Sequence, residues 1–282
     1  LTSMLFATFL TISALAWQAH AQTNITADVC ADPTAYTTCN GDVATQAATC
    51  IDACDDYDIC VLACGCVMYQ EYINCMASTC WNQVYTCEYQ KFITEYFDYC
   101  DLATVPIPFW PAPNDAPNRC SCNLGLIYET ALGFVAEETD CLSNATSLDL
   151  TDPEKASEED LACNCCAVSG GLSAIYEICP DTIPALAGAN EWLSIATGYG
   201  YATDWSSCGT SMDEFNCMAD LGFKAPSENS TTFYQPGDFP ANGTHSLSNV
   251  GGAVTAPPSG SVMSWHQSTV SYTVTASAYN NK

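Results

Sequence analysis

The chain has 282 residues, with 32 acidic residues against five basic ones, 20 cysteines and 48% hydrophobic residues. The apolar content is enough for a folded core, which excludes a disordered acidic chain. The net charge of −27 repels phosphate and therefore excludes nucleic acid as a partner. Thirty of the 32 acidic residues lie within residues 22–224, so the negative charge belongs to the folded part of the chain.

The first segment is typical of a secretory signal peptide. Residues 4–17 form an apolar run of 14, and Ala19-His20-Ala21 follows as a small-residue cleavage site. We expect a signal peptide over 1–21 and a mature chain that begins at Gln22. Because the run is shorter than the roughly 20 residues that cross a bilayer, and no later run approaches its length, we expect no transmembrane span. The predicted location is extracellular or in a cell wall.

Cysteines and glycosylation sequons agree with secretion. An even number of cysteines in a secreted chain indicates disulfide bonds, so we expect ten, with no pairing readable from the sequence. Metal–thiolate ligation is the alternative. The cysteines are Cys30, Cys39, Cys50, Cys54, Cys60, Cys64, Cys66, Cys75, Cys80, Cys87, Cys100, Cys120, Cys122, Cys141, Cys163, Cys165, Cys166, Cys179, Cys208 and Cys217. The sequons, which predict N-linked glycans, are at Asn24, Asn144, Asn229 and Asn242.

Composition divides the mature chain into four parts. Five prolines within residues 105–117 predict an extended connector over 105–118, between a cysteine-rich helical lobe at 22–104 and a second one at 119–224. The lobes hold eleven and nine cysteines, so at least one disulfide must join them if every thiol is paired. Residues 225–282 contain no cysteine and form a tail rich in Ser, Thr, Pro and Gly.

The predicted fold class is mostly α, a disulfide-rich helical core with a largely irregular tail. Aromatic residues recur at three- and four-residue steps over 81–97, which predicts a helix capped by Ser78 or Thr79. A second helix is expected over 123–139, and a third begins at Asp152-Pro153-Glu154. The capping box Ser211–Glu214 predicts a short fourth helix over 215–221.

The tail composition is typical of a flexible, O-glycosylated stalk. Alternation over Ser268–Thr275 suits a β-strand, which is the alternative for that stretch. A glycosylphosphatidylinositol signal needs a hydrophobic tail after the stalk, whereas this chain ends Ala278-Tyr-Asn-Asn-Lys282, so this terminus does not support such an anchor.

Histidine is absent from residues 22–244, which argues against Ser-His-Asp and Cys-His catalysis and against zinc sites with histidine ligands. Paired carboxylates of the glycosidase type are the remaining catalytic option, and a solvated helix face is the alternative for them. The acidic groups are Glu137-Glu138, Glu158-Glu159-Asp160 and Asp213-Glu214. We expect a protein that is not an enzyme.

Two sets of residues are candidates for ligand binding. Carboxylates near Cys60 could hold a metal ion or haem iron, although the twelve-residue EF-hand pattern fails there; they are Asp55, Asp56 and Asp58. Aromatic residues beside glycine or proline could stack on a sugar ring or contact a protein, with core packing as the alternative; they are Tyr199, Tyr201, Trp205 and Trp110.

The cysteine order over residues 50–100 resembles the CFEM domain of fungal extracellular proteins. The steps Cys50-x₃-Cys54, Cys64-x-Cys66 and Cys75-x₄-Cys80 carry the resemblance, while Cys87 is an extra cysteine. It implies a small helical disulfide-rich domain, and some such domains bind haem through an aspartate. Val61–Ala63 occupies the place of that aspartate, so haem binding is not carried over, and Asp58 is the nearest substitute.

More broadly, the chain resembles fungal secreted cysteine-rich proteins of the cell wall or effector type. These features together predict a secreted, non-enzymatic binding protein at a cell wall or host surface. Its expected partner is a wall glycan or an extracellular protein, and no cofactor is required. Extracellular haem or metal capture by the amino-terminal lobe is the alternative function.

Overall fold

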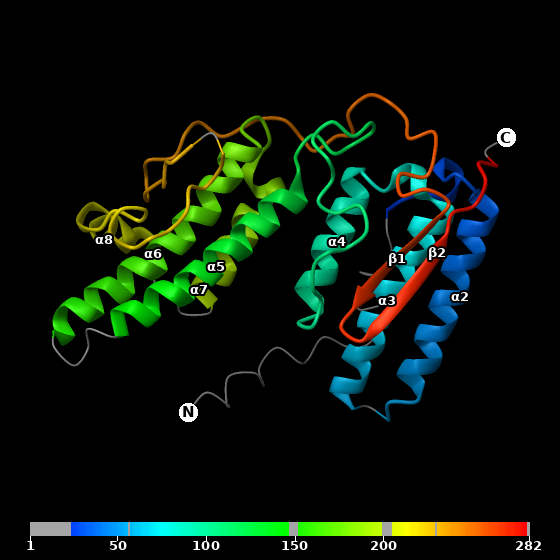
Figure 1. The fold of residues 1–282 in the computed structure, drawn as a ribbon, viewed down its shortest axis with the longest axis horizontal. Coiled ribbons are helices and arrows are strands. Elements are labelled where there is room, and N and C mark those ends of the chain that lie inside the picture. Colours follow the sequence, from blue (N-terminus) through cyan, green and yellow to red (C-terminus); the bar gives the residue numbers. More distant parts are fainter. Residues whose placement is uncertain (1–23, 56, 147–151, 199–204, 229, 281–282) are drawn as a thin grey trace. The chain divides into compact units, whose positions relative to one another are not determined.

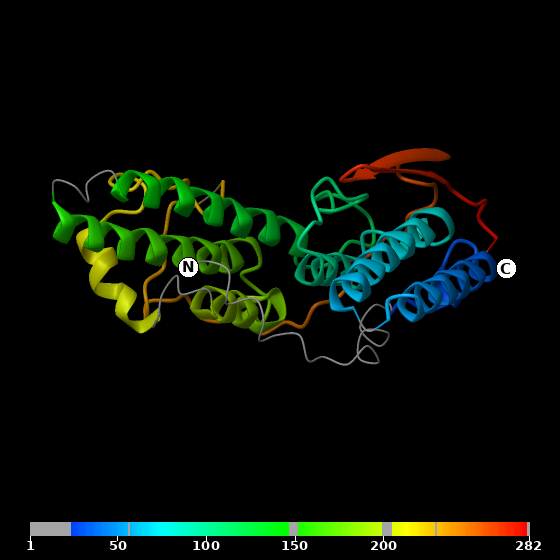
Figure 2. The same cartoon turned by 90° about the horizontal axis from the view of Figure 1, so that it is seen from below.

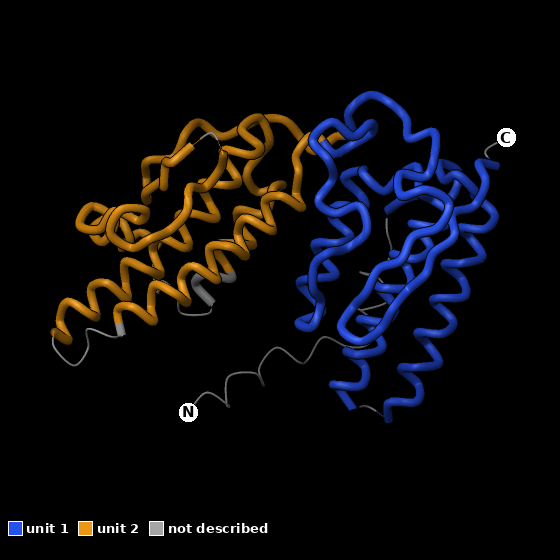
Figure 3. The backbone as a smooth tube through the Cα atoms, in the orientation of Figure 1, with its two compact units in different colours: residues 1–120, 249–282 blue, residues 121–248 orange. Residues whose placement is uncertain are grey.

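The computed structural model describes residues 24–55, 57–146, 152–198, 205–228 and 230–280. The fold is mostly helical with one small two-stranded sheet, as the sequence predicts (Figure 1). The chain forms two compact units, coloured separately in Figure 3. Unit 1 comprises residues 1–120 and 249–282, and unit 2 comprises residues 121–248.

All twenty cysteines are paired, in ten disulfides. The disulfide Cys87–Cys120 spans the proline-rich segment, as the odd cysteine numbers of the two expected lobes require. However, the division of the chain differs from the one expected from composition. The proline-rich segment belongs to unit 1, and the tail is shared between the two units. As a result, each disulfide lies within a single unit.

Unit 1 is built on an antiparallel helical hairpin, α2 (Pro33–Asp52) and α3 (Asp58–Thr79) (Figures 1 and 2). Asp32 caps α2 by accepting a hydrogen bond from the backbone nitrogen of Ala35 at 3.0 Å, and Pro33 occupies the first turn, where its missing N–H has no cost. Three disulfides, Cys39–Cys75, Cys50–Cys64 and Cys54–Cys60, cross-link the hairpin. In each one the two cysteines lie at equal sequence distances from Tyr57, the spacing that an antiparallel pair of helices imposes.

The helix expected after Ser78 or Thr79 begins later than predicted. Thr79 is the last residue of α3, a 3-10 turn follows at Trp81–Gln83, and α4 spans Cys87–Tyr99 with Thr86 as its cap. The disulfide Cys30–Cys80 and the non-helical backbone at Cys80 separate the two helices. The predicted aromatic face exists, and Phe92 and Tyr96 pack on Tyr69 of α3 with ring centroids 5.1 and 5.7 Å apart.

The end of the chain folds back onto unit 1 as the hairpin β1 (Val262–Gln267) and β2 (Val270–Thr275). The strand expected over Ser268–Thr275 is therefore present, but it begins two residues later because Ser268 lies in the turn with φ 51°. Buried Gln267 accepts hydrogen bonds from the Tyr96 hydroxyl and the Thr104 nitrogen, and donates to the Thr104 carbonyl. These bonds tie the tail to α4, so its described part is not a separate stalk.

Unit 2 is built on a second antiparallel pair, α5 (Leu124–Thr146) and α6 (Pro153–Ile178), which lie side by side in both views (Figures 1 and 2). The start signal at Asp152 is confirmed, because Asp152 accepts from the Lys155 nitrogen. The helix expected over 123–139 is present and extends to Thr146, and Asn123 accepts from the Leu126 nitrogen at its start. Two disulfides, Cys122–Cys179 and Cys141–Cys163, cross-link the pair. The adjacent residues Cys165 and Cys166 of α6 form disulfides with two different partners, Cys208 and Cys217 respectively.

The remaining elements of unit 2 are the 3-10 turns Pro184–Ala187 and Trp205–Ser207 and the helices α7 (Ala189–Gly198) and α8 (Cys208–Glu214). The prediction of a helix over 215–221 was wrong. Ser211–Glu214 ends α8 rather than capping a new helix, and Asn216 instead accepts hydrogen bonds from the nitrogens of Met218 and Ala219 in a turn.

Within the described residues, α3 and α6 are long and apolar enough to cross a membrane by length and composition. Of the apolar window of α6, 72% is buried inside the structure. For the apolar window of α3 the buried share is 44%. Core helices pass the same test, so the expectation of no transmembrane span stays a prediction.

Two glycines allow α6 to approach its neighbours closely. A Cβ atom on Gly170 would lie 2.5 Å from the Phe134 ring of α5, and one on Gly171 would collide with the Trp192 ring of α7. Trp192 also donates a hydrogen bond to the Val168 carbonyl at 2.9 Å. The aromatic rings therefore lie directly on the backbone of α6.

We predict that Gly170→Ala and Gly171→Ala each destabilise unit 2 by about 1–3 kcal/mol, because the added methyl group overpacks a tight contact. Gly133→Ala is the matched control on α5, since a Cβ there meets nothing within 4 Å. It should stabilise the helix by about 0.5–1 kcal/mol through its higher helix propensity. Hydrogen exchange of α5 and α6 amides with intact disulfides measures the change. Equal protection in Gly171→Ala and Gly133→Ala would contradict the close packing.

Candidate functional site

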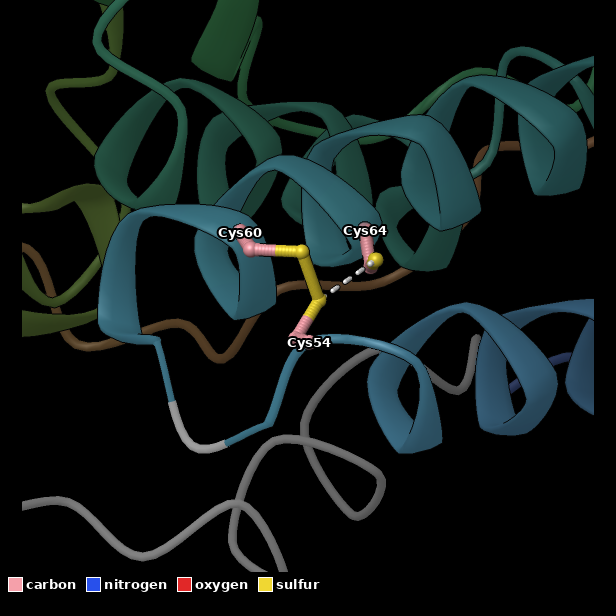
Figure 4. A group of neighbouring side chains, drawn as sticks. All are labelled: Cys54, Cys60 and Cys64. Carbon is pink, nitrogen blue, oxygen red and sulfur yellow. Dashed lines mark hydrogen bonds between the residues drawn. A yellow bond between two sulfur atoms is a disulfide. The ribbon is translucent and has the colours of Figure 1, made fainter.

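The turn of the α2–α3 hairpin gathers four cysteine sulfurs. Cys54–Cys60 and Cys50–Cys64 are adjacent disulfides, and the Sγ atoms of Cys54 and Cys64 are 3.6 Å apart (Figure 4). Because both atoms are disulfide-bonded and carry no hydrogen, this is a sulfur–sulfur contact. Within the described residues, Cys54, Cys60 and Cys64 form the group whose ligand atoms lie close enough to hold a metal ion. Oxidised sulfurs are poor ligands, so metal binding there would require reduction.

Two of the three acidic residues predicted for metal or haem binding are described, and both lie at this turn. Asp55 and Asp58 are both exposed, and Asp56 lies outside the described residues. Asp58 is the first residue of α3, where the helix macrodipole favours a carboxylate. Asp55 has φ 45°, a conformation that aspartate tolerates in turns. Both residues therefore suit the local backbone, and neither belongs to the group formed by Cys54, Cys60 and Cys64.

An apolar stripe on α3 begins directly after Asp58. Ile59, Ala63 and Val67 recur at four-residue steps, so they lie on one helical face, and all three are exposed. We call these three residues the α3 stripe. Exposure is large for the two bulky members, 64% for Ile59 and 51% for Val67. This stripe could not be predicted from the sequence, because its apolar residues have the same hydrophobicity as those of a buried helix.

Two further exposed apolar residues are linked to α3, one by the sequence and one through a nearby disulfide. Tyr57 precedes α3 and is exposed. The disulfide Cys66–Cys100 holds the end of α4 against the helical turn that carries Val67. Leu102, two residues beyond Cys100, is 83% exposed, the highest value among the exposed large hydrophobic residues of the described chain. This grouping differs from the singly scattered apolar residues that are normal on protein surfaces.

Negative charge accompanies the stripe. Burial raises the pKa of Tyr69 on α3, and the charges of Glu95 and Asp98 on α4 add to the shift. Tyr69 is buried, so these two carboxylates act on the face of α3 that packs against α4 and not on the stripe. Asp58 and Asp101, both exposed, lie beside Ile59 and Leu102 in the sequence. The negative charge at the stripe itself is therefore that of Asp58, directly before Ile59.

Two of the four aromatic candidates can be placed. Trp110 is buried and packs on Phe97 with centroids 5.0 Å apart, so core packing describes it. Trp205 is partly buried and lies 6.3 Å from Phe239. Tyr199 and Tyr201 lie outside the described residues.

Sequence reasoning missed the cluster that Trp205 joins. Tyr176 of α6 stacks on Phe239 with centroids 5.2 Å apart, and Tyr234 lies 6.0 Å from each of them. The Tyr234 hydroxyl donates to Glu177 at 2.6 Å, and this bond, with burial and the charge of Glu177, raises the pKa of Tyr234 to about 12. We call Tyr176, Tyr234 and Phe239 the unit 2 aromatic cluster. Its members come from α6 and the tail, too far apart in sequence for a local pattern.

The sequons occupy different settings. Asn24, Asn144 and Asn242 are exposed, and Asn229 lies outside the described residues. Asn144 is in the last turn of α5, and Asn242 accepts a hydrogen bond from the Tyr176 hydroxyl. Glycosylation at these positions stays a prediction.

One of the acidic groups contains a buried carboxyl. Glu137 contacts Lys224 at 3.1 Å, whereas its neighbour Glu138 is 2% exposed and its Oε1 atom has no hydrogen-bond partner. Burial raises the pKa of Glu138 from 4.5 to about 7. A solvated face therefore does not describe Glu138, while Glu158 is exposed and Glu159 contacts Lys155 at 3.5 Å.

We predict that Glu138 makes unit 2 more stable in acid. The pKa of the folded state is raised, so the stabilisation is complete below about pH 4.5 and is lost as the pH rises through about 7, where folding must bury a charge. A shift of this size corresponds to about 3 kcal/mol. Glu138→Gln should remove this part of the pH dependence, and the exposed Glu154→Gln should leave it unchanged. Hydrogen exchange of α5 and α6 at pH 4.5 and 8 measures both, and identical pH profiles for Glu138→Gln and wild type would contradict the prediction.

Comparisons with known proteins identify no relative. No protein family matches the chain, no curated protein matches it, and no solved structure matches it. The CFEM resemblance therefore stays a prediction drawn from cysteine spacing. Function must be argued from the residues of the site.

Proposed function

We propose that this protein is secreted, is not an enzyme, and acts by binding at a cell wall or host surface. Ten disulfides support an extracellular location, because thiols stay reduced in the cytosol. The observation that carries the binding role is the exposed α3 stripe. Exposed apolar side chains grouped in this way are typical of protein interaction surfaces.

The partner that fits this surface is a basic, amphipathic segment of an extracellular protein. Apolar side chains of such a segment would pack on Ile59 and Val67, and its lysine or arginine side chains would face Asp58 at the start of α3. Charge complementarity of this kind speeds association and weakens with salt. A wall glycan fits this surface less well, because the described aromatic candidates Trp110 and Trp205 pack elsewhere in the fold and not on the α3 stripe.

Replacing the bulky residues of the α3 stripe should abolish this binding. We predict that Ile59→Ser/Val67→Ser weakens binding of a labelled helical peptide of alternating leucine and lysine clusters by about tenfold or more, as expected when two apolar contacts are lost. Fluorescence anisotropy with the full secreted chain measures the affinity. Raising the salt concentration should weaken binding to the wild type.

The control for this experiment lies elsewhere in unit 1. Val262→Ser/Val270→Ser also removes two exposed valines, one from each strand of the hairpin, and keeps every charge. It should bind the peptide like the wild type. If both double variants lose the same affinity for the peptide, or neither loses any, the assignment of binding to the α3 stripe is wrong. The peptide would then be held only by general attraction to an acidic protein.

Haem capture is a second candidate for the same surface. The observation that favours it is the position of two exposed oxygen ligands, Tyr57 and Asp58, at the start of the α3 stripe. Tyrosine is a known haem ligand, and a haem face would cover apolar side chains. A saturable Soret change with haemin that is lost in Ile59→Ser/Val67→Ser, without peptide binding by the wild type, would favour this candidate over a protein partner.

A further inference from the structure

We infer that Asn242 carries an N-linked glycan whose first sugar packs on the unit 2 aromatic cluster, so that the glycan forms part of the folded unit. The local sequence is Phe239-Pro-Ala-Asn242-Gly-Thr244, which places an aromatic ring three residues before the acceptor asparagine. None of the other three sequons has an aromatic residue at that position. The inference rests on the proposed secretion, because the modification occurs in the secretory pathway.

The Asn242 side chain is held through its amide oxygen. The Tyr176 hydroxyl donates to Asn242 Oδ1 at 2.9 Å, while the Asn242 side chain is exposed. A glycan attaches at Nδ2 and leaves the oxygen free to accept a hydrogen bond. The observed bond therefore holds the amide in a state that is compatible with modification of its nitrogen.

The Tyr176 ring lies next to this amide. The bond to Tyr176 places the Asn242 amide at the edge of this ring, and Tyr176 stacks on Phe239 with an interplanar angle of 28°. Both rings are partly exposed. The C–H groups on one face of a pyranose carry partial positive charge and are attracted to the negative face of an aromatic ring. A sugar attached to Nδ2 would thus lie next to the rings of Tyr176 and Phe239, on which it can pack.

The sequon segment is held in place. The His245 nitrogen donates to the Asp181 carbonyl at 2.9 Å, and the Ile183 nitrogen donates to the His245 carbonyl at 3.0 Å. Gly243 lies so close to Asp181 and Thr182 that a Cβ atom there would collide with their backbone. The segment therefore has a fixed position next to the end of α6. A sugar attached to it loses little additional freedom when it packs on the rings.

The chemistry of attachment needs one co-reactant, a lipid-diphosphate-linked oligosaccharide. Asn242 Nδ2 attacks the anomeric carbon of its first sugar and forms a C–N bond. The bond from that carbon to the diphosphate oxygen breaks, the lipid diphosphate leaves, and Nδ2 loses one proton. Thr244 supplies the hydroxyl that the sequon requires. Attachment to the newly made chain is followed by folding, in which the sugar takes its place on Tyr176 and Phe239.

The test compares three forms of the full chain made in a glycosylating eukaryotic host. They are the complete glycoprotein, the protein trimmed by an endoglycosidase that leaves one sugar on each asparagine, and Thr244→Ala. We expect hydrogen exchange in α6 and the tail to be equally slow in the first two forms. It should be about fivefold or more faster in Thr244→Ala, the size expected for one aromatic contact.

Two control variants make the result specific. Thr26→Ala removes the sequon at Asn24 and should leave exchange in α6 unchanged. Phe239→Leu keeps the sequon but removes the ring, and in this background Thr244→Ala should have at most a small further effect. An effect of Thr244→Ala that persists in full without Phe239, or that also appears in chain made without glycosylation, would overturn the inference.

Peptide mass spectrometry separates failure of this inference from failure of the proposed function. Sequons that are all unmodified, with the chain retained inside the cell, would contradict secretion itself. A glycan at Asn24 or Asn144 with an unmodified Asn242 would support secretion and overturn only the inference about Asn242.

Discussion

Disulfide bonds between antiparallel helices are the constraint on which both units depend. In unit 1 the three disulfides of the hairpin fix α2 against α3 in one register, because each is symmetrical about Tyr57. In unit 2, Cys122–Cys179 and Cys141–Cys163 fix α5 against α6 at two levels. Each cross-link restricts the unfolded chain and typically contributes about 2–4 kcal/mol. A helix fixed in this way needs fewer apolar contacts of its own.

The composition of the helices reflects this constraint. α2 has 20 residues, of which Tyr36, Val43 and Ala47 are the buried ones, so packing alone would hold it weakly. By contrast, α6 is buried along most of its length, and Gly170 and Gly171 allow rings to lie on its backbone. Cross-linking also lets α3 keep Ile59 and Val67 exposed without loss of the fold. A surface for binding can thus lie on a helix that belongs to the scaffold.

The sequence predicted those features that depend on local patterns. The helix start at Asp152 follows from a side-chain cap that the sequence indicates, and this cap is observed. The helix at 33–52 was missed because its Thr- and Ala-rich sequence has no continuous apolar stripe. The cysteine pairing could not be predicted from the sequence. The equal spacing about Tyr57 indicates a pairing only when α2 and α3 are known to form an antiparallel hairpin. The helix expected over 81–97 ends close to the end of α4 at Tyr99, whereas its start was wrong because Cys80 and the 3-10 turn at Trp81–Gln83 come before Cys87.

The candidate sites show the same limit. Asp58 and Trp205 were candidates because of their residue types, but their neighbourhoods could not be predicted. The segment before Leu102 is joined to α3 by the disulfide Cys66–Cys100. Tyr176 contacts Phe239 although more than sixty residues separate them in the sequence. The sequence likewise gave no sign that Glu138 is buried while Glu137 contacts Lys224. Such properties depend on tertiary packing, which no spacing rule contains.

The disulfide map tests the cross-linked two-unit structure most directly. Tandem mass spectrometry of unreduced peptides, with fragmentation between Cys120 and Cys122, assigns the partner of each. We expect Cys120 to be bonded to Cys87 and Cys122 to Cys179, with no bond between a cysteine of residues 30–120 and one of residues 122–217. A disulfide that joins these two ranges, or a free thiol in the secreted protein, would contradict the structure on which the proposed function rests.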